Sequence, residues 1–361
     1  MIQKPDERIA PGSAVTVVDR SGAAVGTGFY NPHTELALRM LARETVDDVE
    51  AFLLRRLHDA VALREKVLRL PDVTNGYRLV HGEGDGFPGL VLDRLGDAVV
   101  AQVRSLAMAD RMEAIGHWLK VREPKLRLVL TVDEESRKHE SIERPPRPQP
   151  FSTEVVEHGI RFTVSPGTGH KTGFFADQRD NRRRFGELAR GRDVLDLFCN
   201  AGGFALAAAR GGAKSVFAAD LDEAAVAQTI ANAKRNALPV RAEQHDAFDL
   251  LREIPVGRYD AIVVDPPKWA LGRTAVPAAL DRYRDVNRLA FEKVAGGGLV
   301  VTCSCSGALP ESLFLKTLAE AAAQAGRDAT IVAMTGAGPD HPVALECPET
   351  RYLKCAFVLV R

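Results

Sequence analysis

The stretch DVLDLFCNAGGFALAAAR (residues 193–210) joins an apolar run to an alanine-rich run through the turn CNAGG. The first run is typical of a buried strand and the second of a helix. Small residues in the turn let the backbone bend tightly and let a ligand approach it closely. The same alternation of a predicted strand and a predicted helix continues along the chain to the last predicted strand. This alternation predicts a parallel sheet covered by helices on both faces.

Seven strands are expected in this part of the chain, and a helix over Glu223–Asn236 with Asp222 as its N-cap. The strands, in chain order, are DVLDLF, SVFAAD, VRAEQ, DAIVVD, GLVVTCS, ATIVAMT and LKCAFVLV. Ligands of open α/β sheets bind beyond the carboxyl ends of the strands. The predicted fold class is therefore α/β, with a Rossmann-like domain around a mostly parallel seven-stranded sheet, and the strand ends are the candidate site.

The first three strand ends carry acidic residues beside a loop of small residues. The loop of the first strand, Asp196–Phe204, lacks the spaced G-x-G-x-x-G of dinucleotide enzymes. Asp220 ends the second strand, 18 residues after Gly202, where an acid commonly holds a ribose hydroxyl. Asp246 follows the third strand and could either reach a nucleobase amine or only cap the next helix. The pairing of loop and acid favours a nucleoside ligand.

The fourth strand ends in DPPKW (Asp265–Trp269). Two prolines can neither continue a helix nor donate to a strand ladder, so they hold the chain extended and rigid beside Asp265. A fixed carboxylate next to a rigid loop can pair with the hydrogen-bond donors of a flat base inserted into the site. A plain turn rarely needs this sequence at a buried strand end, so a functional interpretation is favoured.

The fifth strand ends in VTCSCSG (Val301–Gly307), with two cysteines one residue apart. Strand alternation directs Cys303 and Cys305 to the same face. Cys305 lies further out, between serines and next to a glycine whose amides and hydroxyls could support a thiolate. A free thiol has a pKa of about 8.5, so a nucleophilic cysteine needs such support near neutral pH.

Composition narrows the class of protein without identifying a partner. The 361 residues carry 48 basic and 48 acidic side chains, and 45% are hydrophobic, which is ordinary for a globular protein. Five cysteines with no repeated C-x-x-C spacing predict neither a disulfide framework nor a metal site. No apolar leader or membrane-length apolar run is present, so a reduced, cytoplasmic protein without a membrane partner is expected.

The first half of the chain predicts smaller β-rich modules. The segment Ser13–Asn31 alternates apolar and polar residues around a Ser-Gly turn, which indicates a hairpin. A helix is expected from Val46 onward, with Thr45 as its cap. A second β-rich stretch follows, and it ends in ERPPRPQP (Glu143–Pro150), which is typical of an extended connector.

Seven segments in order give the chain a family resemblance. They are GHKTGFFADQRDNR (residues 169–182), VLDLFCNAGGFA, DPPKW, YRDVN (residues 283–287), TCSCSG, DHPV and PETRYLK. Together they resemble the RlmI-type bacterial 23S rRNA (cytosine-5) methyltransferases, which depend on S-adenosylmethionine. The resemblance covers nearly the whole chain. It implies a class I methyltransferase domain over residues 169–361, a central mixed α/β domain over 74–168, and an N-terminally short PUA-like RNA-binding domain over 1–70.

The resemblance also implies a set of cofactor contacts. The strand-one loop would hold the methionine part, the strand-two acid the ribose, and the strand-three acid the adenine. The FFADQR segment would close over the cofactor. The residues are Gln178, Asp196, Phe198, Asn200, Ala201, Gly202, Asp220, Leu221, Asp246 and Ala247.

The chemistry implied by the resemblance uses a cysteine. A thiolate adds to carbon 6 of cytosine and makes carbon 5 reactive toward the methyl group. The SCS pattern assigns this role to Cys305, whereas related enzymes carry the nucleophile in TCS, which would be Cys303; we favour Cys305. Asp265 would hold the base edge. Lys268 is nearby, either as a participant or as a phosphate contact, and the base that removes the carbon-5 proton is not identified.

The expected partner is RNA, either 23S rRNA or the assembling large subunit, and a homodimer is left open. Three alternatives stand beside this interpretation. Asp-Pro-Pro loops also serve enzymes that methylate base amino groups and need no cysteine. A nicotinamide-dependent dehydrogenase would share the sheet but would need the spaced glycines. A non-catalytic RNA-binding protein would leave DPPKW and TCSCSG without a role.

Overall fold

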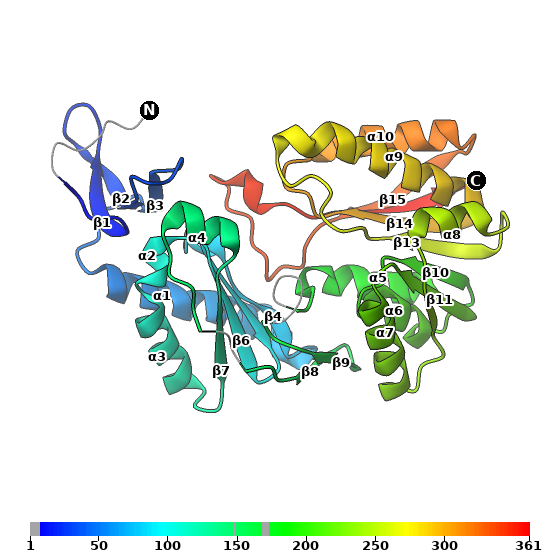
Figure 1. The fold of residues 1–361 in the computed structure, drawn as a ribbon, viewed down its shortest axis with the longest axis horizontal. Helices are drawn as coiled ribbons and strands as arrows, with labels where there is room; N and C mark the ends of the chain where they lie inside the picture. Colours follow the sequence, from blue (N-terminus) through cyan, green and yellow to red (C-terminus); the bar gives the residue numbers. More distant parts are fainter. Residues whose placement is uncertain (1–7, 147–148, 168–172) are drawn as a thin grey trace. The chain divides into compact units, whose positions relative to one another are not determined.

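The computed structural model describes residues 8–146, 149–167 and 173–361, which form two compact units (Figure 1). The N-terminal unit contains the chain up to Val156 together with Val164–Ala176 and Pro339–Thr350. The C-terminal unit contains Glu157–Thr163, Asp177–Gly338 and Arg351–Arg361. The prediction of three modules with boundaries near residues 70 and 168 stays a prediction. Within the described ranges no helix has the length and apolar character needed to span a membrane.

The N-terminal unit begins with a three-stranded antiparallel sheet in the order β1-β2-β3. The predicted hairpin is confirmed, because β1 and β2 pair across the Ser-Gly turn. The predicted cap of α1 is wrong: Asp48 has an extended backbone and accepts a hydrogen bond from the Ala51 amide, so the helix begins after it and not after Thr45. The elements are β1 (Ser13–Val18), β2 (Ala24–Tyr30), β3 (Leu38–Ala42) and α1 (Val49–Ala62).

A four-stranded sheet in the order β4-β5-β6-β7 follows, with helices packed on its apolar side chains. The strands β8 and β9 pair separately as a two-stranded sheet. These elements are β4 (Gly76–His81), β5 (Leu90–Leu95), β6 (Ala98–Val103), α2 (Leu106–Ala109), α3 (Met112–Arg122), β7 (Arg127–Thr131), α4 (Glu134–Glu140), β8 (Thr153–Glu157) and β9 (Ile160–Val164).

The C-terminal unit is built on a seven-stranded sheet in the order β12-β11-β10-β13-β14-β16-β15. The strands from β10 to β14 are parallel, and β16 is antiparallel to both of its neighbours. The predicted α/β fold class and all seven predicted strands are confirmed. The strands are β10 (Asp193–Leu197), β11 (Ser215–Asp220), β12 (Arg241–Gln244), β13 (Tyr259–Val264), β14 (Val294–Ser304), β15 (Ala329–Thr335) and β16 (Lys354–Val360).

Helices cover both faces of this sheet, as Figure 1 shows. Apolar residues of α8, α9 and α10 pack on one face, and those of α5, α6 and α7 pack on the other. The predicted cap of α7 is confirmed, because Asp222 accepts a hydrogen bond from the Ala224 amide. The helices are α5 (Arg179–Leu188), α6 (Gly203–Arg210), α7 (Glu223–Arg235), α8 (Ala247–Glu253), α9 (Val276–Lys293) and α10 (Glu311–Gln324).

The connection between β15 and β16 contributes to the core of the N-terminal unit. The guanidinium of Arg64 has no exposed surface; it donates to both carboxylate oxygens of Asp85 at 2.7 Å and to the Asp340 carbonyl at 2.7 Å. The Asp340 carboxylate in turn accepts from the Arg78 amide at 3.0 Å. The DHPV segment therefore forms part of a buried ionic network in the N-terminal unit.

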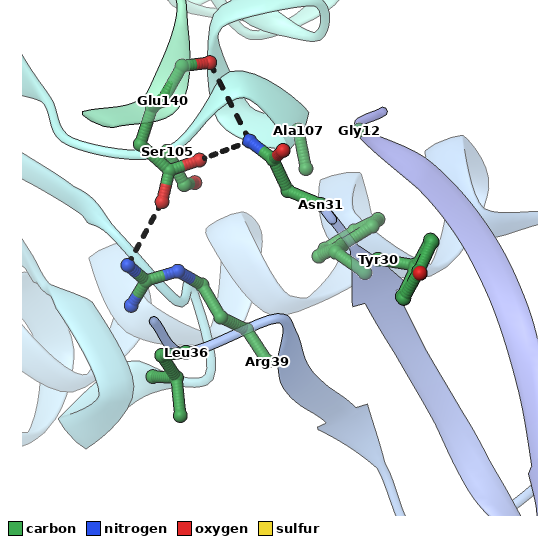
Figure 2. A pocket seen from close by; sticks show the side chains of 9 residues that line it. Gly12, Tyr30, Asn31, Leu36, Arg39, Ser105, Ala107 and Glu140 are labelled. Atoms are coloured by element: carbon green, nitrogen blue, oxygen red, sulfur yellow. Dashed lines mark hydrogen bonds and ion pairs between the residues drawn. The ribbon is translucent and has the colours of Figure 1, made fainter. Parts of the chain in front are cut away.

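Glu140, the last residue of α4, joins the three-stranded sheet to the start of α2 within the same unit (Figure 2). Its side chain is buried, with 3% of the residue exposed. The two carboxylate oxygens accept hydrogen bonds from Asn31 at 2.9 Å and from Arg39 at 3.0 Å, and one also accepts from the Leu106 amide at 3.1 Å. A buried carboxylate with several donors is costly to replace, because its partners are left without an acceptor.

Replacing Glu140 with Ala is expected to lower the free energy of local opening of β1, β2 and β3 by about 2 kcal/mol, less than for a fully buried pair because Arg39 is partly exposed. Amide hydrogen exchange of these strands measures the change. Replacing the exposed Glu135 of the same helix is the control and should change it by less than about 0.5 kcal/mol. Equal exchange in the two variants would contradict the anchoring role of Glu140.

Candidate active site

The loop after β10 is a tight turn held from behind by α7. Asn200 and Gly202 both have positive φ angles, +49° and +82°. Thr229 donates to the Asn200 carbonyl at 2.8 Å, and Asn232 donates to the Ala201 carbonyl at 3.0 Å. A Cβ atom at residue 202 would lie 2.8 Å from the Thr229 methyl carbon. Glycine is therefore required here both for backbone conformation and for space.

Three carboxylates gather behind and beside this loop. Asp196 is 1% exposed and accepts a hydrogen bond from the Ala205 amide at 2.8 Å. Asp220 accepts from the Asn200 amide at 2.9 Å. Burial raises the pKa of Asp196 well above its usual range, and the negative charges of Asp265 and Asp220 add to the shift. A ligand that brings positive charge to this loop would relieve the repulsion, which suits the ammonium and sulfonium groups of S-adenosylmethionine.

The second and third strand ends supply the next part of the site. Leu221, directly after the β11 acid, is 65% exposed and offers an apolar surface. Asp246 caps α8, because its Oδ1 accepts from the Phe248 amide at 2.8 Å and from the Asp249 amide at 3.2 Å. Asp246 therefore caps α8 through Oδ1, which is one of the two roles predicted for it. Its Oδ2 makes no hydrogen bond to any described residue. Ala247 follows and is buried.

The proline loop after β13 is tied to the start of α5. Gln178 is buried and donates from Nε2 to Asp265 at 3.1 Å. Its carbonyl oxygen accepts from Asn181 at 2.6 Å, which fixes the orientation of the amide. Lys268 is exposed, whereas the Trp269 ring packs inward. The Asp265 carboxylate is therefore held in place by a buried partner.

The two cysteines of the fifth strand have different environments. Cys303 is 0% exposed, and burial together with its neighbour Cys355 raises the pKa of the Cys303 thiol well above its usual range. Cys305 is partly exposed, just beyond the end of β14. A thiol that resists ionisation is a poor nucleophile. The geometry therefore favours Cys305 over Cys303 as the reactive thiol.

The buried Ser306 side chain connects the proline loop, α9 and the cysteine loop. Its hydroxyl accepts from the Ala270 amide at 3.2 Å and lies 3.4 Å from the hydroxyl of Tyr283. Burial raises the pKa of Tyr283 to about 12. Tyr283 of the YRDVN segment thus contacts the cysteine loop through Ser306. The sequence pattern alone does not predict this contact.

The structure brings most of the predicted site residues to one edge of the sheet. The loop after β10, the acid of β11, Asp265 and Cys305 all follow the carboxyl ends of neighbouring parallel strands. Phe198, with a φ of +60°, packs its ring 6.0 Å from that of Trp269 and so joins the β10 loop to the proline loop. Residues 169–172 of the GHKTGFFADQRDNR segment lie outside the described residues.

This arrangement of sheet and strand-end loops agrees with the Rossmann-like fold of S-adenosylmethionine-dependent methyltransferases. A family model described as S-adenosylmethionine-dependent methyltransferase matches residues 134–340, and one described as a PUA-like domain matches residues 1–43. The cofactor of the protein is S-adenosylmethionine. The alternative of a nicotinamide-dependent dehydrogenase is therefore wrong, because the chain matches a methyltransferase family.

Relatives narrow the class to a family. The chain is 35% identical to ribosomal RNA large subunit methyltransferase I of Aeromonas hydrophila, over 97% of this chain and 91% of that protein. It is 33% identical to the protein of the same name in Citrobacter koseri, over 98% and 92%. An S-adenosylmethionine-dependent methyltransferase structure from Streptococcus mutans superposes with a TM-score of 0.81 at 21% identity, over 98% of this chain and 93% of that chain, which supports the fold.

The chain therefore belongs to the ribosomal RNA large subunit methyltransferase I family.

Replacing Asp196 with Asn tests whether this carboxylate serves the cofactor at a cost to the fold. Because burial raises the pKa of Asp196 in the folded protein, ionising this carboxyl lowers the free energy of unfolding as the pH rises above the unfolded pKa of about 3.9. The variant should therefore unfold at a higher temperature than the wild type at pH 7, and the difference should vanish below about pH 4. Asn retains an acceptor for the Ala205 amide.

The same Asp196→Asn variant should bind S-adenosylmethionine about tenfold or more weakly in calorimetric titration, because it loses a charged partner. Thermal unfolding and titration on one preparation separate the two effects. A variant that is less stable at pH 7 and binds the cofactor normally would contradict the assignment.

Proposed function

We propose that the protein transfers a methyl group from S-adenosylmethionine to carbon 5 of a cytosine in large-subunit (23S) rRNA, through a covalent adduct with Cys305. The observation that carries the proposal is the contrast between two cysteines: the Cys303 thiol is buried, whereas Cys305 is partly exposed beyond β14. The relatives named ribosomal RNA large subunit methyltransferase I support the choice of rRNA, and the PUA-like match supports an RNA partner.

The thiolate of Cys305 forms a bond to carbon 6 of the cytosine ring, and the electrons of the 5,6 double bond move toward N3. Carbon 5 would then have enamine character and would attack the sulfonium methyl group of S-adenosylmethionine. The bond between that methyl group and the sulfur would break, its electron pair would stay on sulfur, and S-adenosylhomocysteine would leave. Loss of the carbon-5 proton to a base restores the double bond, and the carbon–sulfur bond breaks to release the thiolate. This route divides one difficult step into easier ones.

Asp265 is proposed to bind the edge of the target base. Its carboxylate is fixed by the Gln178 amide and follows a parallel strand adjacent to the one that carries Cys305. A fixed acceptor at the N3 and amino edge can orient the ring for thiolate addition and can stabilise a proton at N3 during that step. Lys268 is exposed in the same loop, where its ammonium can contact RNA phosphate or take part in proton transfer.

The cofactor is proposed to lie along the carboxyl ends of β10, β11 and β12. The β10 loop and Asp196 would bind the methionine part, Asp220 the ribose hydroxyls, and Asp246 the adenine amine through its uncapped Oδ2. Leu221 would provide an apolar contact for the adenine ring. Each of the five cysteines, all within the described ranges, carries a thiol and not a disulfide, which supports a reducing compartment such as the cytoplasm.

Replacing Cys305 with Ala should reduce methyl transfer to unmodified rRNA by about a thousandfold or more, because the nucleophile is lost. The measurement is incorporation of labelled methyl groups, followed by mapping of the labelled base. Cys303→Ala and Cys347→Ala are the controls and should keep activity within about tenfold of the wild type. Full transfer to a base amino group by Cys305→Ala would instead support the amino-methyltransferase alternative.

A further inference from the structure

Lys354, the first residue of β16, is buried in the C-terminal unit with 5% of its surface exposed. Its ammonium donates to the Ser306 carbonyl at 2.7 Å and to the Leu309 carbonyl at 2.8 Å. Lysine is rarely buried unless its charge has a partner. The two backbone carbonyls accept two of the hydrogen bonds that the ammonium can donate, and both belong to the loop that follows Cys305.

Lys354 is linked to both chain neighbours of Cys305. In the antiparallel pairing of β14 with β16, Ser304 lies opposite Lys354. Ser306, on the other side of the cysteine, gives its carbonyl to the ammonium. Cys305 thus lies between two residues that Lys354 meets, one through the strand pairing and one through its ammonium.

The charges around this turn agree with a lysine–thiolate interaction. Burial lowers the pKa of Lys354 to about 8, and the negative charges of Cys305 and Glu311 oppose that change. Arg351 also faces the lysine, but it pairs with Glu311 at 2.6 Å. On the other side, Tyr283 interacts with Cys305 and is neutral near pH 7, because burial raises its pKa to about 12.

Asp265, directly after β13, also acts on this region, and its negative charge contributes to the raised pKa of Tyr283 and of Cys303. Its negative charge opposes formation of a thiolate at the same rim. A thiolate at Cys305 therefore needs a nearby cation, and Lys354 is a buried cation whose position is fixed by the cysteine loop itself.

We propose that Lys354 is a positioning residue for Cys305: it fixes the loop that presents the thiol and supplies the positive charge that supports the thiolate. The inference rests on the proposed role of Cys305 as nucleophile and adds a residue that the strand-end pattern did not indicate. A cysteine beside a lysine ionises more readily than a free one.

The test is the rate of iodoacetamide alkylation of Cys305 as a function of pH, followed by peptide mass spectrometry of the full-length protein. Wild-type Cys305 should react with a midpoint below the value of about 8.5 for a free thiol. In Lys354→Met the midpoint should rise by about one unit, and methyl transfer at pH 7 should fall about tenfold and recover toward higher pH. Lys354→Arg, which keeps the charge, should retain a midpoint close to that of the wild type.

Cys347, read in the same digests, is the internal control, and its midpoint should not change with the residue at position 354. An unchanged Cys305 midpoint in a Lys354→Met protein that still binds S-adenosylmethionine would overturn the proposal. A wild-type midpoint at or above about 8.5 would also overturn it, whether or not the Met variant folds.

The two proposals fail separately. If Cys305→Ala abolishes methyl transfer but the alkylation midpoint does not depend on Lys354, only the role of Lys354 is wrong. If the midpoint depends on Lys354 but Cys305→Ala methylates normally, the electrostatic inference holds and the covalent function is wrong.

Discussion

The parallel pairing of β10 with β13 and of β13 with β14 is the constraint on which the site depends. Leu197 lies opposite Val264, and Val264 lies opposite Thr302, so three strands end at one edge of the sheet. The loop after β10, the proline loop (Asp265–Trp269) and the loop that begins with Cys305 follow these ends directly. Because β16 is antiparallel to β14, its first residue, Lys354, comes to the same edge. The sheet thereby brings together residues that lie more than one hundred positions apart in the sequence.

Charge is distributed unevenly along this edge. The carboxylates of Asp196, Asp220 and Asp265 lie on the β10, β11 and β13 side, where burial and mutual repulsion raise the pKa of Asp196. The buried ammonium of Lys354 lies on the β14 and β16 side. The acidic side suits a cofactor with two positive groups, and the basic side suits a thiolate. In the proposed mechanism, one sheet edge would hold a cofactor with positive groups and a thiolate of opposite charge, and the neutral net charge of the whole chain does not show this division.

The sequence predicts the C-terminal sheet well because most of its strands are apolar runs between helices. It also indicates Cys305, since only one of the two cysteines lies beyond the strand. It does not predict Lys354, because a lysine before an apolar strand normally indicates a solvated strand end. The insertion of Asp340 into the network of Arg64 is likewise beyond local patterns, since the contact spans 276 positions. The cap of α1 was misplaced by three residues because threonine and aspartate are both good caps.

The central claim is that the sulfur of Cys305 bonds to the target cytosine, and a substrate analogue tests it most directly. When carbon 5 of that cytosine carries fluorine, no proton can be lost after methyl transfer, so the carbon–sulfur bond cannot break. Mass spectrometry of the protein after incubation with this RNA and S-adenosylmethionine should show a methylated nucleotide attached to the peptide that contains Cys305. Turnover or binding of the analogue with no adduct on that peptide would contradict the covalent mechanism.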